Sequence, residues 1–236
     1  MRKLFVILML GVMFVFPSFV SAQNNVTISN LTIQLWPEYD QPSMLVIADF
    51  QVAAASSFPA DLTFRIPQDA NLIAVASLTS DGNFLNVIFD GPNVEGEWQV
   101  FTLTVSDNTI YRFEYYQPLT FNGDQRLFSY LWDGAYAVDA FHVLVLEPAD
   151  VTSLLMTPAH QSISQESGGK TYDSGIVKLA QGQQFALNLE YQKSTDTLSA
   201  PPQGIQPSAP VDENTPGRVS LNNYLPYLIG GLGVIM

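Results

Sequence analysis

Residues 185–192 read Phe185-Ala186-Leu187-Asn188-Leu189-Glu190-Tyr191-Gln192, in which apolar and polar positions alternate almost without interruption. Successive side chains of a β-strand point to opposite faces, so this period of two predicts a strand with one buried face. The odd-numbered residues Phe185, Leu187, Leu189 and Tyr191 are expected in a core. The even-numbered positions are expected to face water.

The same alternation recurs along most of the chain in short runs. Further runs lie at 26–36, 44–52, 62–66, 84–89, 98–105, 110–116, 126–132 and 138–146. Gly, Pro, Asn and Asp separate the runs, and Ser106-Asp107-Asn108 predicts a tight hairpin connection between two of them. Nine or ten strands without a sustained helical period predict an all-β fold. We expect an antiparallel two-sheet β-sandwich, immunoglobulin-like or jelly-roll-like.

The first 22 residues have the three-part layout of a secretory signal peptide. Met1-Arg2-Lys3 is basic, residues 4–20 are apolar, and Val20 and Ala22 occupy the small-residue positions of a cleavage site. We expect an N-terminal signal helix over 1–22, with an uncleaved anchor as the alternative. Export would place the domain of residues 23–193 on the extracytoplasmic side.

The composition changes after residue 193. Residues 194–220 are rich in Pro, Ser, Thr, Gln and Ala and contain no aromatic residue, which is typical of a disordered stalk. Residues 221–236 end in an apolar, uncharged stretch that is shorter than the about 20 residues of a bilayer span. We interpret 221–236 as the start of a truncated transmembrane helix that anchors the chain in the cytoplasmic membrane. A short final strand or a surface-lying tail is the alternative.

The chain is acidic, with a net charge of −13 that becomes −15 once the two basic residues of 1–22 are removed. We expect no nucleic acid partner, because phosphate binding needs clustered Lys and Arg. The sequence has no cysteine, which excludes thiol catalysis and Cys-based metal sites within the chain. An exported protein that uses no disulfides is typical of a bacterial or archaeal envelope.

Motifs for catalysis, metals or cofactors are absent from the sequence. Neither Gly-x-Ser-x-Gly nor His-Glu-x-x-His nor a phosphate-binding glycine loop occurs. The two histidines are interpreted as structural or solvated, since His142 lies in an apolar run and His160 in a polar stretch. We therefore expect no catalytic residue, no metal site and no cofactor.

Two aromatic turns provide the candidate binding residues. In Trp36-Pro37-Glu38-Tyr39-Asp40 a large aromatic residue ends a strand, and a rigid proline precedes two acids that look exposed. Trp36 and Tyr39 would be presented to a ligand while Glu38 and Asp40 supply hydrogen bonds. The alternative is that Trp36 caps the core and residues 37–42 fix a corner.

A second turn of the same kind is Trp132-Asp133-Gly134-Ala135-Tyr136. Its candidate binding residues are Trp132, Asp133 and Tyr136, with the same structural alternative. Loops at one end of a sandwich commonly form a contact surface, and we expect both turns to contribute to it.

Several strings of the chain resemble a family of uncharacterised bacterial envelope proteins. They are the stretch 35–42 running into Met44-Leu45-Val46-Ile47, together with Phe113-Glu114-Tyr115-Tyr116, Phe128-Ser129-Tyr130-Leu131-Trp132 and Leu189-Glu190-Tyr191-Gln192-Lys193. The resemblance implies a signal peptide, a β ectodomain, a Pro-rich stalk and one membrane span, in some members followed by a cytoplasmic zinc ribbon. It implies no activity and no catalytic residue.

These observations favour a membrane-anchored, noncatalytic binding or interaction module of the cell envelope, with a polysaccharide or a protein as partner. Two alternatives are open. A polysaccharide-acting enzyme would use two carboxylates about 5–9.5 Å apart, chosen from Glu38, Asp40, Glu114 and Asp133. A purely architectural surface protein would self-associate through an apolar face or an uncovered sheet edge.

Overall fold

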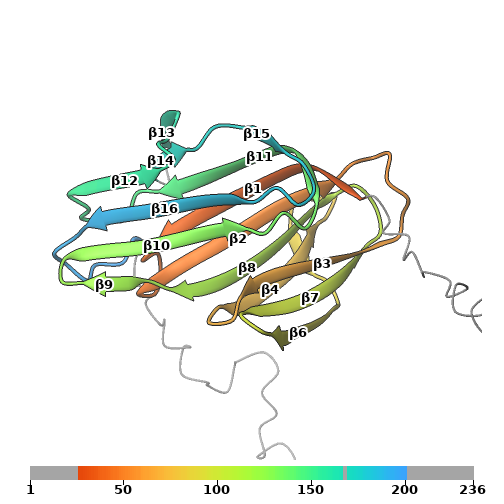
Figure 1. The fold of residues 1–236 in the computed structure, drawn as a ribbon, viewed down its shortest axis with the longest axis horizontal. Helices are drawn as coiled ribbons and strands as arrows, with labels where there is room; N and C mark the ends of the chain where they lie inside the picture. Colours follow the sequence, from red (N-terminus) through yellow and green to blue (C-terminus); the bar gives the residue numbers. More distant parts are fainter. Residues whose placement is uncertain (1–25, 167–168, 201–236) are drawn as a thin grey trace, which may run out of the picture. The chain divides into compact units, whose positions relative to one another are not determined.

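The computed structural model describes residues 26–166 and 169–200, and this part of the chain is all-β (Figure 1). The described residues form sixteen strands and no helix. The strands are β1 (Thr27–Pro37), β2 (Ser43–Val52), β3 (Ala60–Pro67), β4 (Asn71–Leu78), β5 (Phe84–Asn86), β6 (Phe89–Glu95), β7 (Trp98–Val105), β8 (Ile110–Pro118), β9 (Thr120–Asn122), β10 (Gln125–Trp132), β11 (Ala137–Leu146), β12 (Ser153–Thr157), β13 (Ser162–Glu166), β14 (Gly169–Asp173), β15 (Val177–Leu179) and β16 (Phe185–Gln192).

Nine strands form the largest sheet, in the order β13-β14-β11-β1-β2-β8-β4-β5, with β15 also paired to β11. Neighbouring strands run antiparallel except β1 and β11, which are parallel. The expectation of wholly antiparallel sheets is therefore wrong at this pair. The physical reason is that the chain passes through other sheets between β2 and β11, and such a crossover permits parallel pairing.

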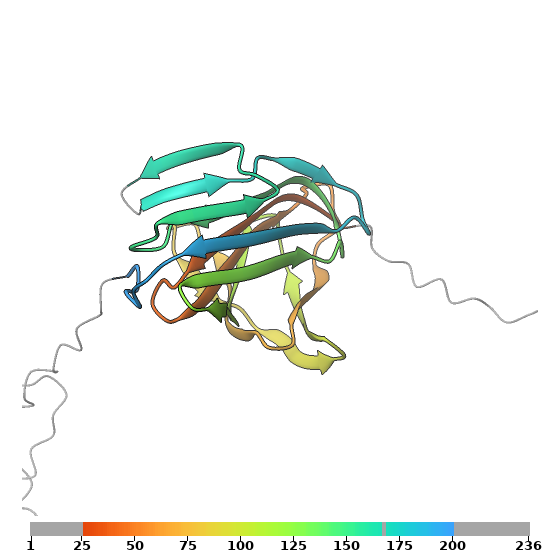
Figure 2. The ribbon, with the colours of Figure 1, turned by 60° about the vertical axis from the view of Figure 1, so that its left-hand side comes forward.

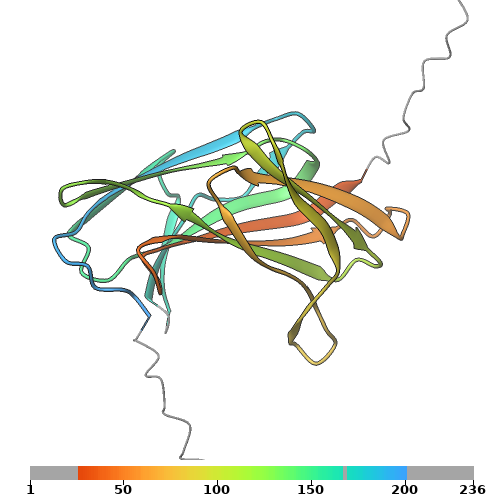
Figure 3. The ribbon, with the colours of Figure 1, turned by 90° about the horizontal axis from the view of Figure 1, so that it is seen from below.

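Two smaller sheets, β3-β7-β6 and β12-β16-β10-β9, cover the same face of the large sheet (Figure 2, Figure 3). Phe64 of β3 packs on Phe50 of β2, and Phe185 of β16 packs on Phe141 of β11, with 4.8 and 4.9 Å between ring centroids. Phe50 and Phe141 are both register partners of Leu31, so they lie on one face of the sheet. The second layer is thus divided between two sheets, where the sequence predicted one.

Residues 185–192 form β16 with the expected bounds. Leu187, Leu189 and Tyr191 are buried in the core, and Phe185 packs against it. The prediction of a strand with one buried face is confirmed here. Burial of alternate apolar side chains between the layers is the main source of stability for such a fold.

The Ser106-Asp107-Asn108 connection is not a hairpin. β7 pairs with β3 and β6, whereas β8 pairs with β2 and β4 in the large sheet, so the connection crosses from one layer to the other. The hydroxyl of Tyr111 accepts a hydrogen bond from the Ser106 amide at 2.9 Å and fixes this crossing. The hairpin prediction was wrong because an alternating strand can bury its apolar face in either layer.

The predicted signal helix and C-terminal helix fall outside the described residues. Within the described part, no helix is long and apolar enough to cross a membrane. Residues 194–199, which the composition assigns to the stalk, contact the β domain. Ala149 N donates to Ser199 Oγ at 3.0 Å, and Thr195 Oγ1 donates to Asp150 at 3.1 Å.

We expect Phe64→Ala to lower the free energy of unfolding by about 3–5 kcal/mol. Phe64 joins the two layers through ring contacts with Phe50, Phe101, Phe113 and Tyr136. Urea unfolding of the full chain measures the change. The control is Leu155→Ala on the 60 % exposed Leu155, for which we expect a change within about 0.5 kcal/mol; equal losses for both variants would contradict the packing.

Alkaline pH is expected to unfold the domain. Burial raises the pKa of Tyr115, Tyr130 and Tyr191 above the ordinary tyrosine value. The unfolded chain then loses these protons first, so their contribution is complete below about pH 10 and falls above it by about 1.4 kcal/mol per pH unit for each tyrosine. Unfolding free energies from about pH 8 to 12 measure the slope, which Tyr130→Phe should reduce by up to about 1.4 kcal/mol per pH unit. Tyrosinate absorbance that precedes unfolding would refute the prediction.

Candidate functional site

Trp36 lies near the end of β1 and points away from the core, because it alternates with the buried Ile33 and Leu35. Tyr39 follows in the turn that leads to β2. Its ring lies beside that of Trp36, with 4.6 Å between the centroids and 55° between the planes. Both side chains are half-buried. The turn therefore places two aromatic side chains together on the outer face of the large sheet.

These two rings form one end of a groove of about 440 Å³, here called the Trp36 groove. Its walls come from β1, the 37–42 turn, β11, β13 and β14. The lining residues are Gln34, Trp36, Tyr39, His142, Leu144, Leu146, Ser162, Ser164, Gly169, Thr171 and Asp173. A cavity of this size, part aromatic and part polar, is typical of small-molecule sites, which span about 300–1,000 Å³.

His142 lies in the groove wall between two polar partners. Its Nε2 is 2.8 Å from Thr32 Oγ1, which is a hydrogen bond. Its Nδ1 is 3.6 Å from Asp173 Oδ1, too far for a hydrogen bond, and Asp173 instead accepts one from Gly175 N at 2.7 Å. His142 is thus held in place from one side and faces a carboxylate on the other.

Glu38 was expected to be exposed, and this expectation is wrong. Its relative exposure is 1 %, and its carboxylate accepts a hydrogen bond from Tyr191 Oη at 2.8 Å. Lys193 Nζ lies 3.5 Å and Arg126 Nε 3.8 Å from the same carboxylate. The two cations and the hydroxyl compensate the loss of water around the charge, which is why an acid in a turn can be buried here.

The backbone of Glu38 is also bonded at both ends. Its amide donates to Ser43 O at 2.9 Å, and its carbonyl accepts from Ser199 N at 2.9 Å. Its φ of 44° lies in the left-handed region, an unusual conformation for a non-glycine residue. Glu38 thus fixes the turn that carries Tyr39 and is not itself one of the lining residues of the groove.

Asp40 and Glu114 lie elsewhere on the outer face. Asp40 is exposed and accepts a hydrogen bond from Tyr116 Oη at 2.8 Å. Glu114 lies 3.5 Å from Arg112, which binds Asp49 through two hydrogen bonds of 2.6 and 2.8 Å. Neither carboxylate lines the Trp36 groove.

The second predicted turn is built into the core. Trp132 is buried and packs against Phe141. The hydroxyl of Tyr136 accepts from Thr63 N at 2.7 Å and donates to Thr63 O at 3.2 Å. Asp133 lies 3.2 Å from Arg65. Tyr136 and Arg65 line a separate cavity of about 400 Å³ that contains neither Trp132 nor Asp133.

The two turns do not meet at one end of the fold. Thr27 at the start of β1 pairs with Ala137, the residue after the second turn, whereas Trp36 lies nine residues further along. At about 3.3 Å per residue, roughly 30 Å separates the two turns. The expectation of one contact surface made by both turns is therefore wrong. The parallel pairing of β1 with β11 is the cause.

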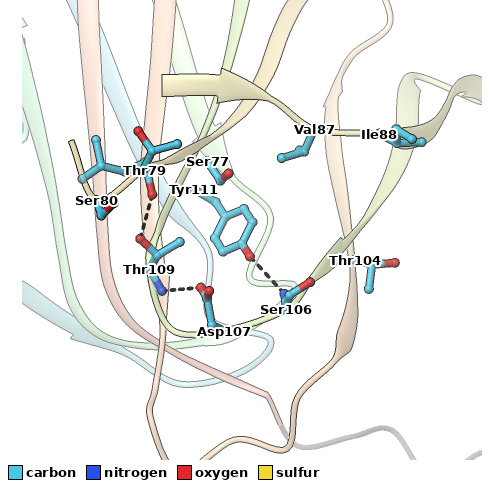
Figure 4. Close-up of a pocket in the computed structure, with 11 residues that line it drawn as sticks. Ser77, Thr79, Ser80, Val87, Ile88, Thr104, Ser106, Asp107, Thr109 and Tyr111 are labelled. Carbon is cyan, nitrogen blue, oxygen red and sulfur yellow. Dashed lines mark hydrogen bonds between the residues drawn. The ribbon is translucent and has the colours of Figure 1, made fainter. Parts of the chain in front are cut away.

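A second candidate is a cavity of about 910 Å³ that is lined by residues of β4, β7 and β8 and of the segments next to them (Figure 4). Its polar groups largely bond each other. Thr109 N donates to Asp107 Oδ1 at 2.9 Å, and Thr109 Oγ1 donates to the Leu78 carbonyl at 3.1 Å. The hydroxyl of Tyr111 is occupied by Ser106 N. The Trp36 groove is the stronger candidate, because its two aromatic rings are half-exposed.

The groove contains residues that the sequence analysis missed. Ser162 and Ser164 of β13 and Thr171 of β14 form its polar wall. The strings Ser162-Ile163-Ser164 and Thr171-Tyr172-Asp173 do alternate, but three residues are too few to distinguish a strand from a turn. Only the pairing of β13 with β14 and of β14 with β11 brings them to Trp36.

Within residues 26–166 and 169–200, no group of three or more His, Asp or Glu side chains is close enough to hold a metal ion. No family model matches the chain, and no significant match to a curated protein is found. The resemblance to bacterial envelope proteins thus stays a prediction.

We expect Glu38→Gln to lower the free energy of unfolding by about 3–5 kcal/mol, because it leaves the buried Lys193 without its counter-charge and leaves Arg126 with the exposed Asp196 alone. Urea unfolding at neutral pH measures the loss. The matched control is Glu95→Gln, at an exposed carboxylate on β6, with an expected change within about 0.5 kcal/mol. A Glu38→Gln chain as stable as the control would show that the buried pairing is not needed.

Proposed function

We propose that this chain is a membrane-anchored, extracytoplasmic, noncatalytic binding module of a bacterial or archaeal cell envelope. Its contact surface would be the Trp36 groove. Export and anchoring are supported by the sequences of residues 1–22 and 221–236. The binding role is supported by the groove itself.

The fold of the module would be an elaborated β-sandwich of the immunoglobulin-like or jelly-roll-like kind. Support comes from the two packed layers, in which one face of the large sheet is covered and the other faces water. Sixteen strands exceed the about seven to nine of these domains. The extra strands include β13 and β14, which build one wall of the groove.

The observation that carries the proposal is the pair of aromatic rings beside a polar wall. Trp36 and Tyr39 offer apolar area that loses little conformational entropy on binding. Ser162, Ser164 and Thr171 offer hydroxyl groups across the groove. Apolar surface with a few convergent polar groups is the usual composition of a binding site.

The carboxylate enzyme gains no support from the contacts of its four candidate acids. Glu38 is committed to Tyr191 and two buried cations, and Asp133 lies beside Arg65. Asp40 accepts from Tyr116, and Glu114 lies beside Arg112. Each acid therefore has a structural partner of its own, and none lines the groove.

The architectural alternative rests on apolar side chains exposed near the short edge strands β5 and β6. Leu85, Ile88 and Val94 are 60 %, 96 % and 63 % exposed. Exposed apolar residues at a sheet edge favour self-association. This alternative predicts that the chain sediments by itself, independently of Trp36.

Cosedimentation with a whole bacterial envelope preparation tests the binding proposal. We expect the full chain in mild detergent to cosediment, and Trp36→Ala and Tyr39→Ala to reduce the association by about 10-fold. Trp98→Ala is the matched control, because Trp98 is a half-buried indole on β7 outside the groove. Unfolding free energies of all three variants establish that they are folded. Equal association of wild type and folded Tyr39→Ala, or sedimentation without envelope, would refute the proposal.

A further inference from the structure

We infer that the ligand of the Trp36 groove is a short segment of an uncharged glycan chain. The inference rests on the proposed function and names the ligand class. It follows from three properties of the groove: the pair of aromatic rings, the hydroxyl and acceptor groups in its polar wall, and the pairing of the nearby cations with carboxylates.

The aromatic pair matches the apolar side of a sugar ring. A pyranose presents C–H groups on its faces and hydroxyl groups around its edge. The ring planes of Trp36 and Tyr39 are inclined by 55°, with 4.6 Å between the ring centroids. Together the two rings therefore form an angled surface and are not stacked in parallel. A ring that rests on one of them is contacted at its side by the other.

The polar wall matches the hydroxyl groups at the edge of the sugar. Ser162, Ser164 and Thr171 carry hydroxyls that both donate and accept, as sugar hydroxyls do. The amide of Gln34 donates to Asp49 at 3.0 Å, and its oxygen remains an acceptor. Asp173 adds a carboxylate, which accepts only. A hydroxyl-rich ligand can satisfy every member of this set.

The charges around the groove disfavour an anionic ligand. No Lys or Arg is among the described residues that line the groove. Lys170, between Gly169 and Thr171 in sequence, donates to Glu147 at 2.8 Å, and this contact raises the pKa of Lys170 and keeps it charged and paired. Arg112 on the outer face is bound to Asp49. Asp173 and the net charge of −13 would repel uronate, phosphate or an acidic peptide.

The size of the groove limits the ligand to a few sugar units. Its volume of about 440 Å³ lies at the lower end of the range for small-molecule sites. The groove lies on a sheet face and not in an enclosed interior, so a longer chain could continue beyond it. The site therefore suits an internal segment or an end of a glycan polymer.

Isothermal titration of the full chain in mild detergent tests the inference. The probes are hexamers of glucose and of N-acetylglucosamine, a hexamer of galacturonate, and an acidic hexapeptide. We expect at least one neutral hexamer to bind with a micromolar to millimolar Kd, at least about 10-fold tighter than galacturonate or the peptide. Affinity should change little between low and physiological salt, because no ion pair forms.

Variants locate the binding. Trp36→Ala and Tyr39→Ala should each weaken the neutral hexamer about 10-fold, and the paired change Ser162→Ala with Ser164→Ala should weaken it with little loss of stability, since both serines are exposed. Trp98→Ala should bind as the wild type does. Tighter binding of galacturonate or the peptide would overturn the inference. The inference would also be overturned if the chain associates with the envelope through Trp36 while neither neutral hexamer binds the chain or competes with the envelope. That result would leave the proposed function standing.

Discussion

From Leu31 onward every second side chain of β1 is buried beneath the smaller sheets, and the positions between them therefore lie on the opposite face of the large sheet. Leu31, Ile33 and Leu35 belong to the core. Thr32, Gln34 and Trp36 follow on the outer face as a geometric consequence of the strand. Shifting the register of β1 by one residue would exchange the two sets. The aromatic end of the groove therefore depends on the same packing that holds the layers together.

Most long strands could be predicted because their alternation extends over enough residues to be unambiguous. β4 was missed, because residues 72–76 are all apolar and do not alternate. β7 and β16 have the predicted bounds, and β1, β2, β8 and β11 differ by one or two residues at their ends. Short strands such as β14 and β15 give no such signal. Sheet membership could not be predicted at all, because alternation shows that one face is buried and not which layer buries it. The wrong hairpin at 106–108 is the clearest example.

Only the part of the site that depends on residues close together in sequence could be predicted. Trp36 and Tyr39 are three residues apart in sequence, and a turn brings such neighbours together locally. The burial of Glu38 could not be predicted, because its partners Arg126, Tyr191 and Lys193 lie about 90 to 155 positions away in the sequence. A single acid in a polar turn has the same sequence signature whether it is exposed or neutralised by distant cations. The prediction that both turns form one contact surface was wrong for a similar reason. It depended on the direction of β11 relative to β1, which the local sequence does not show.

The bond from Ser199 N to the carbonyl of Glu38 has a mechanical consequence. Tension applied at Ser199 acts on the turn that holds Tyr39 through this bond, and on Ala149 through the bond from its amide to Ser199 Oγ, before it reaches β16. Lys193 resists that pull, because its ammonium group is held by the Glu38 carboxylate and by the Thr197 carbonyl. The turn that carries Tyr39 is thus among the first parts of the domain to bear a load from the C-terminal side.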